Sequence, residues 1–420
     1  MSHSHVPGNS WHWLRLWWAP HRLAFAAAAL MLMVSSLWWL AQLGMRAGGL
    51  AAPPPTVSPT LLHGVAMTYG FLPLFFCGFL FTAGPKWLGV EAPRATQLTL
   101  PVGLQALGTL LWLAGGWLDR PLSLAGGTLL ALGLLLAYGR FAGLWLRSPA
   151  VDRVHASLIA LAGTWGVACL LGVLWAETTQ QPDLASRWLL SGLWGFVVGT
   201  YVTVAHRMIP FFTSSALPLV RIWRPMWVLA FLWLAVLTQV LAAWWSTPGG
   251  VPMAWGWLHG FWMLVSGLVV LWLAFVWGLV QSLRIRLLLM LHIGFVWLGL
   301  GFILEAIGLH WALLIGPASW ALGALHATTM GFLGSLMLAM VTRVSCGHGG
   351  RALVADGWVW GAFWLLQLAT GLRVWAALAD AEQTQWLTLL ALCAWTAAVL
   401  PWALRLLRWY GQPRADGRPG

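Results

Sequence analysis

The chain has 420 residues, of which 60% are hydrophobic and only 8% are charged. A soluble domain carries about 25% charged residues, so this composition excludes an ordinary soluble protein and indicates one that resides in a lipid bilayer. The net charge is +12, from 22 Lys and Arg against 10 Asp and Glu. The basic residues are spread over many loops and both tails, so the charge does not indicate nucleic-acid binding.

Apolar runs about 20 residues long, the length of a helix that crosses the hydrocarbon core, recur along the chain. They predict an all-α polytopic membrane fold of twelve helices. These form a single integral-membrane domain over residues 1–420, with short tails at 1–21 and 408–420. The predicted helices cover residues 22–43, 62–83, 98–117, 121–140, 154–175, 187–207, 225–245, 254–278, 285–307, 317–342, 357–378 and 384–407.

The basic residues also predict the orientation of these helices. With the N-terminus on the cytoplasmic side, eighteen of the 22 Lys and Arg fall in inner segments. Cytoplasmic segments of membrane proteins are enriched in Lys and Arg, so both termini are predicted to be cytoplasmic. The four basic residues on the outer side are Arg46, Arg120, Arg187 and Arg373.

A histidine followed four residues later by a methionine occurs three times near the outer ends of predicted helices. Residues four apart share a helix face, so each copy presents an imidazole and a thioether together. These side chains are ligands of haem iron and copper. Methionine is also a common packing residue, and a lone histidine at a helix end, such as His155 or His310, is expected to be interfacial or hydrogen-bonded. The three copies are His63/Met67, His259/Met263 and His326/Met330.

Other histidines lie toward the cytoplasmic ends of their helices and form a second candidate group. Arginines accompany them, and arginine beside histidine at a membrane face suits haem propionates, phosphate head groups or simple anchoring. Neighbouring threonines are expected to orient imidazole rings. The group comprises His206, His292 and His348 with Arg207 and Arg343, and the threonines are Thr203, Thr213 and Thr342. The candidate metal ligands of both groups are His63, His326, His259, His206 and His292.

One acid, Glu305, lies inside a predicted helix. An ionisable group in the bilayer is costly and therefore a candidate functional residue. It is expected to pair with His310, to relay protons, or to reach the membrane interface.

Five segments spread along the chain carry long motifs. They are FTAGPKWLG at 81–89, AHRMIPFFT at 205–213, Leu291-His292 with Gly294, His326–Arg351 and Pro413–Gly420. These segments resemble NnrS proteins, a family of haem- and copper-containing membrane proteins of the bacterial nitric oxide response. The resemblance covers nearly the whole chain and implies a b-type haem.

The segment that enters the second helix departs from this family pattern. Many members carry His-x-His-Glu there, whereas this chain reads His63-Gly64-Val65-Ala66. The second histidine and the acid are absent, which puts copper in doubt and favours haem b without copper.

The outer histidines indicate where a haem would bind. His63 and His326 lie at similar depth in the second and tenth predicted helices, so one iron is expected between them. This pairing also resembles the low-spin haem of haem-copper oxidase subunit I, which likewise has twelve helices. The seventh helix, 225–245, has no histidine, so that enzyme's copper site is not apparent.

These observations predict an NnrS-like haem protein of the bacterial inner membrane that acts in nitric oxide stress or denitrification. Its expected partners are the lipid bilayer and nitric oxide or another small diatomic ligand, and the sequence does not identify an electron donor. Whether the protein is an enzyme stays open. The alternatives are a redox enzyme of the haem-copper oxidase kind, acting on nitric oxide or quinol, and a transporter that passes ions or metals along its histidines.

Overall fold

The computed structural model describes residues 10–49, 55–217, 219, 221–245, 253–315 and 320–418. The ends of the predicted tails, at 1–9 and 419–420, and the first residues of the predicted helix 317–342 lie outside this range. Every regular element in the described part is helical. The α-helices are Pro20–Ala47 (α1), Pro59–Val65 (α2), Leu72–Leu88 (α3), Thr99–Gly115 (α4), Arg120–Leu146 (α5), Val154–Thr178 (α6), Pro182–Gly192 (α7), Gly199–Ala216 (α8), Met226–Trp245 (α9), Met253–Val276 (α10), Leu279–Ser282 (α11), Arg286–Leu314 (α12), Trp320–His326 (α13), Ser335–His348 (α14), Gly357–Ala376 (α15) and Ala381–Tyr410 (α16).

Three segments of π-helix join pairs of these α-helices into longer stretches. They are Ala66–Gly70 after α2, Leu193–Val198 after α7 and Ala327–Gly334 after α13. A π-turn holds an extra residue, and such turns are frequent at functional sites. Three of the membrane-length stretches are therefore interrupted α-helices.

All twelve predicted spans coincide with helices, so the predicted all-α polytopic membrane fold is confirmed. Eleven of the described helical stretches are long and apolar enough to cross a membrane. The twelfth, α15, has 20 residues but includes Gln367, Arg373 and four tryptophans. Several helices run past their predicted ends. The helix α12 continues from the predicted end at residue 307 to Leu314, and its polar residues Glu305 and His310 both have hydrogen-bond partners.

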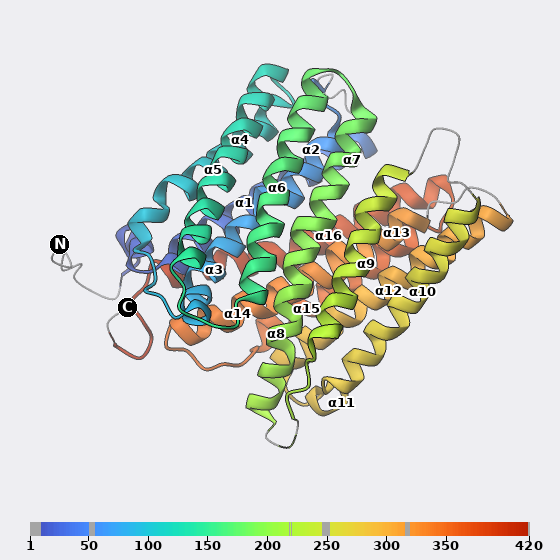
Figure 1. Ribbon diagram of the computed structural model, residues 1–420. Coiled ribbons are helices and arrows are strands. Elements are labelled where there is room, and N and C mark those ends of the chain that lie inside the picture. The colour runs from blue at the N-terminus through green and yellow to red at the C-terminus, as the bar shows by residue number, and fades with distance from the viewer. Residues whose placement is uncertain are drawn as a thin grey trace.

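The helices lie side by side in one bundle (Figure 1). Among the closest neighbours are α4 with α5, α10 with α12 and α15 with α16. Glycines allow the α4–α5 contact, because a Cβ on Gly108 would lie 2.5 Å from the backbone nitrogen of Leu130. Small residues at helix contacts are typical of membrane proteins. The first helix packs against α16 as well as α3, so the two ends of the chain meet.

Arginines hold these two ends together. The Arg22 guanidinium donates to the carbonyl oxygens of Tyr410 at 3.1 Å and Gln412 at 2.8 Å, and Arg15 donates to Gly411 at 3.1 Å. These carbonyls lie at or just beyond the C-terminal end of α16, where cations are favoured. Both ends of the described chain therefore lie at the same end of the bundle (Figure 1).

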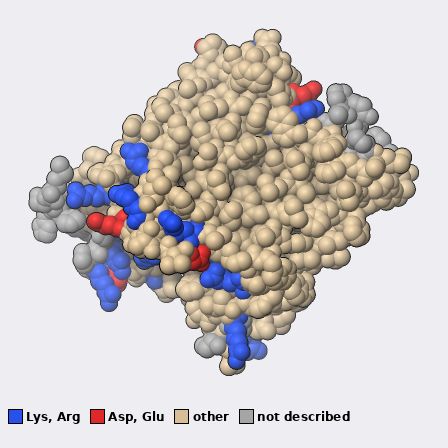
Figure 2. All heavy atoms as spheres, viewed as in Figure 1, with Lys and Arg blue, Asp and Glu red and all other residues tan. Residues whose placement is uncertain are grey.

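Lys and Arg side chains gather along the side of the molecule where the chain ends lie (Figure 2). The rest of the visible surface is nearly free of charge (Figure 2). This uneven distribution is the one that the positive-inside rule uses to assign a cytoplasmic face.

The charged end of the bundle also contains the N-cap of α15. The Asp356 carboxylate accepts a hydrogen bond from the backbone N–H of Val359 at 3.1 Å. It also forms an ion pair with the Arg405 guanidinium through two contacts, and in one of them Nη1 lies 2.9 Å from Oδ1. The hydrogen bond from Arg405 and the cap lower the pKa of Asp356. The carboxylate thus connects the start of α15 to the last helix.

The Asp356 contact predicts a loss of stability in acid. A carboxylate with a lowered folded-state pKa stabilises the fold above its ordinary pKa of about 4, and this contribution disappears as the pH falls through the lowered value. We expect Asp356→Ala to lower the free energy of unfolding by about 1 kcal/mol at neutral pH, mostly through the lost cap. Melting of the detergent-solubilised protein at neutral and acidic pH measures this. The Asp356→Asn variant keeps a capping group and should lose the pH-dependent part alone. An equal pH dependence in wild type and Asp356→Asn would contradict the assignment.

The orientation gives a second prediction. Reporter fusions after Arg94, Arg221 and Arg351 should be active on the cytoplasmic side, and fusions after Pro55 and Asp380 on the outer side. A fluorescent reporter paired with alkaline phosphatase at each position measures this. An inverted result at any one of these positions would mean that the helix order across the membrane is wrong.

Candidate functional site

His63 lies in the last turn of α2, directly before a π-helical segment. Its imidazole stacks on the Trp39 ring of α1, with the ring centroids 4.2 Å apart and the planes inclined by 19°. The Nδ1 atom is buried and has no hydrogen-bond partner. A buried polar atom without a partner is costly, so this nitrogen stands out as available to a bound group.

His326 ends α13 and is also followed at once by a π-helical segment. Its Nδ1 atom lies 2.8 Å from the carbonyl oxygen of Leu322. A carbonyl oxygen only accepts hydrogen bonds, so Nδ1 carries the proton and Nε2 keeps its lone pair. Metal-binding histidines commonly donate the other ring N–H in this way.

The fold brings these two histidines together, although more than 200 residues separate them in the sequence. His63 and His326 are close enough to interact electrostatically, and Arg373 of α15 interacts with both. The Nη1 atom of Arg373 is buried and has no hydrogen-bond partner. The sequence had marked Arg373 only as an outer basic residue, because nothing in its local pattern shows that α15 lies beside α13.

The third outer histidine, His259, belongs to a separate polar cluster with Glu305 and Gln239. His259 of α10 contacts the Glu305 carboxylate of α12 through Nε2 at 3.3 Å, and Gln239 of α9 donates to the other Glu305 oxygen. The expectation that Glu305 pairs with His310 is wrong. Residues five apart point to different faces of an α-helix, and His310 instead donates to the carbonyl of Ala306 at 2.7 Å.

The methionines of the three repeats are packing residues. Met67 and Met330 are partly buried against the hydrophobic core. Met263 is fully buried, and its sulfur accepts a contact from Gln239 at 3.2 Å. The repeated spacing therefore identified the histidines, whereas the thioethers belong to the core.

The inner histidines do not form one cluster. His206 has both ring nitrogens engaged, one with His155 at 3.0 Å and one with the carbonyl of Pro225 at 3.2 Å. His292 contacts Thr213 at 3.1 Å and has a buried Nδ1 without a partner. In this arrangement His206 offers no free nitrogen to a metal.

His348 has a neighbour that the sequence did not single out. Its ring lies 4.7 Å, centroid to centroid, from the ring of His21 at the start of α1. His21 is buried with Nδ1 unpartnered. It was missed because residues up to 21 were assigned to a tail. Throughout the described ranges, no group of three or more His, Cys, Asp or Glu side chains could hold a metal ion.

The arginines and threonines named with the inner group mostly have other partners. Arg207 lies over the Trp87 ring at 4.8 Å, and Arg343 lies over Phe212 at 4.1 Å. Of the three threonines, only Thr213 contacts a histidine. Thr203 accepts from Trp233 at 2.9 Å, and Thr342 accepts from Trp402 at 3.0 Å.

An apolar cavity of about 60 Å³ lies between α1, α3, α8, α12 and α14. Aromatic, methionine and aliphatic side chains form its walls, including Phe75, Tyr201, Met208, Met337 and Met340. A dry apolar cavity of this kind accepts small apolar molecules.

A family model described as "NnrS protein" matches residues 15–414 of the chain. The chain belongs to the NnrS family. The match includes every α-helix from α1 to α16, so the resemblance inferred from the five motifs is confirmed. No curated protein matches the chain. NnrS membership supports a membrane protein related to the nitric oxide response.

Membership also gives a physical reading of one family motif. FTAGPKWLG at 81–89 ends α3, and Gly89 closes the helix in the left-handed conformation with φ of 65°. Glycine adopts this conformation at a helix end without the steric cost of a side chain. The final glycine of the motif is therefore structural.

Proposed function

We propose that this chain is a haem-binding, multi-pass protein of the bacterial inner membrane that acts in the nitric oxide response, with its haem between His63 and His326. The observation that supports this proposal most is that two imidazoles within electrostatic range of each other each have a nitrogen free for a ligand. The family membership supplies the nitric oxide context.

The residues at this place fit a haem. The Leu322 carbonyl orients His326 and leaves its Nε2 lone pair free. Trp39 fixes the plane of the His63 ring, whose buried Nδ1 has no partner. Two histidines from separate helices are an ordinary ligand set for haem iron. The same two side chains, without a third ligand, are too few for the closed tetrahedral site of zinc.

When bound, a haem supplies an iron that binds diatomic gases and exchanges electrons. The chain's own residues would hold the group, His63 and His326 through their ring nitrogens, with the Leu322 carbonyl fixing the His326 ring. The cavity lined by Phe75 and Met337 would let a small apolar gas such as nitric oxide reside within the bundle. This supports binding of nitric oxide, or protection against it, as the role of the protein.

The axial pair gives a sharp prediction. In the proposed site both histidines would hold the iron, so replacing His63 or His326 with alanine would remove one of its ligands. Each single variant should therefore lose haem or change from a six-coordinate low-spin to a high-spin absorption spectrum. The His63→Ala/His326→Ala double variant should look no worse than the more damaged single variant, because both residues act on the same iron.

His310→Ala is the matched control for this experiment. His310 also donates Nδ1–H to the carbonyl four residues before it, but it lies in the group around α10. Its replacement should leave the haem spectrum unchanged. If both the His63 and His326 variants keep full haem and a wild-type spectrum, the axial assignment is wrong. A wild-type protein without a Soret band would remove the haem proposal altogether and leave the transporter alternative.

The metal content gives a separate prediction. His63-Gly64-Val65-Ala66 lacks the histidine and acid found in many NnrS proteins. We expect the purified protein to contain haem and little copper, as measured by haem extraction and elemental analysis of the same sample. Copper at one atom per chain would contradict this, and His259→Ala would then test whether the His259–Glu305 group holds it.

A further inference from the structure

Arg373 is a half-buried cation that forms no ion pair with the described part of the chain. Its Nη1 atom has no hydrogen-bond partner. All ten Asp and Glu of the chain lie in the described ranges. Five ion pairs with a nitrogen–oxygen distance of at most 4.0 Å occur in the described ranges, and Arg373 takes part in none of them. A buried charge without a partner is strongly unfavourable.

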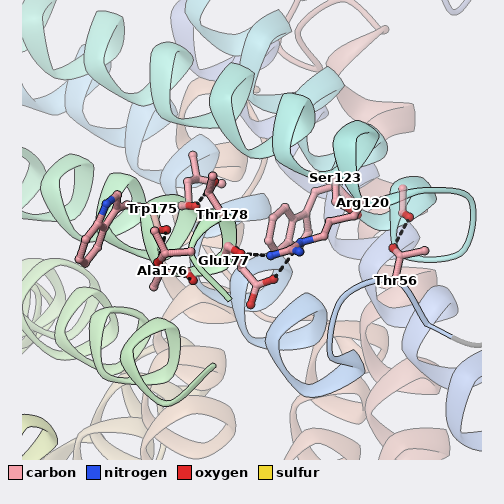
Figure 3. A network of polar contacts seen from close by, with 11 residues as sticks. Thr56, Arg120, Ser123, Trp175, Ala176, Glu177 and Thr178 are labelled. Atoms are coloured by element: carbon pink, nitrogen blue, oxygen red, sulfur yellow. Dashed lines mark hydrogen bonds and ion pairs between the residues drawn. The ribbon is translucent and has the colours of Figure 1, made fainter. Parts of the chain in front are cut away.

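Another outer arginine, Arg120, also has a buried nitrogen without a hydrogen-bond partner, its Nε, but the fold gives it a counter-charge. Arg120, at the start of α5, donates to the backbone carbonyl of Glu177, and its Nε lies 3.9 Å from the Glu177 carboxylate (Figure 3). The end of α6 thus provides both an oxygen acceptor and a negative charge. No carboxylate is provided for Arg373.

The position of Arg373 indicates what its missing partner belongs to. The helix α15 packs closely on α13, because a Cβ on Gly323 would lie 3.2 Å from Ala377 and 3.5 Å from the carbonyl of Val374. Arg373 interacts electrostatically with His326 on that neighbour and with His63 opposite. Three groups with buried or unengaged nitrogens thus lie within electrostatic range of one another, and the third is a permanent cation.

We propose that Arg373 binds a carboxylate of the group held between His63 and His326. The site then recognises two features of a cofactor. One is an iron that the imidazole nitrogens coordinate, and the other is a carboxylate that the Arg373 guanidinium binds. A haem with free propionates has both. This inference rests on the proposed function, and it adds a carboxylate subsite at Arg373 to the axial histidines.

The test compares two cofactors that differ only at the carboxylates. The full-length protein, purified without haem from haem-deficient cells, is titrated in detergent with protohaem or with its dimethyl ester, and the Soret band measures binding. A charge-assisted hydrogen bond contributes enough for about a tenfold difference in affinity. We therefore expect wild type to bind protohaem about tenfold more tightly than the ester.

Variants of Arg373 test whether the preference for protohaem over its ester depends on this side chain. Arg373→Gln removes the cation and should bind both cofactors with the weaker affinity of the ester, whereas Arg373→Lys keeps a cation and should retain part of the preference. The matched control is Arg120→Gln/Glu177→Gln, which removes another outer arginine together with its acid and so leaves no unpaired charge. The control should keep the full preference.

The outcomes separate this inference from the proposed function. If wild type binds neither cofactor, the proposed haem function fails. If wild type binds both equally and His63→Ala weakens both, the haem site stands and the carboxylate subsite is overturned. A full preference in Arg373→Gln also overturns it. If Arg373→Gln does not yield a monodisperse protein, the wild-type comparison still decides, because it requires no variant.

Discussion

The absence of water from the bilayer interior is the constraint on which this structure depends. Each polar group in the bundle must find its partner within the chain. Buried hydroxyls meet this demand by bonding to the carbonyl one turn earlier, as Thr213 does to Ile209 at 2.9 Å. Tryptophan N–H groups reach between helices, as Trp112 does to the carbonyl of Leu62 at 3.2 Å. Several buried nitrogens in the described part of the chain lack a partner, and those of His63 and Arg373 belong to side chains that interact electrostatically with each other.

The same inventory of hydrogen bonds divides the histidines into two kinds. His206 has both ring nitrogens engaged by the protein, so its role in this arrangement is to connect helices. His326 has one nitrogen engaged and one free. The side chains are chemically identical and both occur in motifs shared with the NnrS family. Their surroundings, rather than the motif, distinguish a structural histidine from one that is ready to bind a ligand.

The sequence predicted the features that depend on local composition. Apolar runs located all twelve helices, and the spacing of His63 and His326 from the ends of their runs placed them at one depth. Features that depend on side-chain direction or on distant contacts were not accessible. Of the alternatives considered for Glu305, the pairing with His310 was wrong, because the direction of Glu305 around α12 brings it to His259 of α10.

Long-range contacts explain the other omissions. His21 was missed because its contact with His348 joins residues at opposite ends of the chain. Arg373 was counted as a charge and not as a site residue, because only the packing of α15 on α13 brings it near His63. The π-helical turns after both histidines also left no recognisable signal in the hydrophobic pattern.

The contact between the two chain ends has a consequence for biosynthesis. The first helix enters the membrane early, but the carbonyls that Arg22 binds belong to Tyr410 and Gln412, among the last residues to be made. These contacts between Arg22 and the end of α16 can therefore form only after translation is nearly complete. The pocket of His63 and His326 gains its α15 wall at the same late stage. A cofactor that contacts α15 as well as His63 and His326 could make all of its contacts only once α15 is in place.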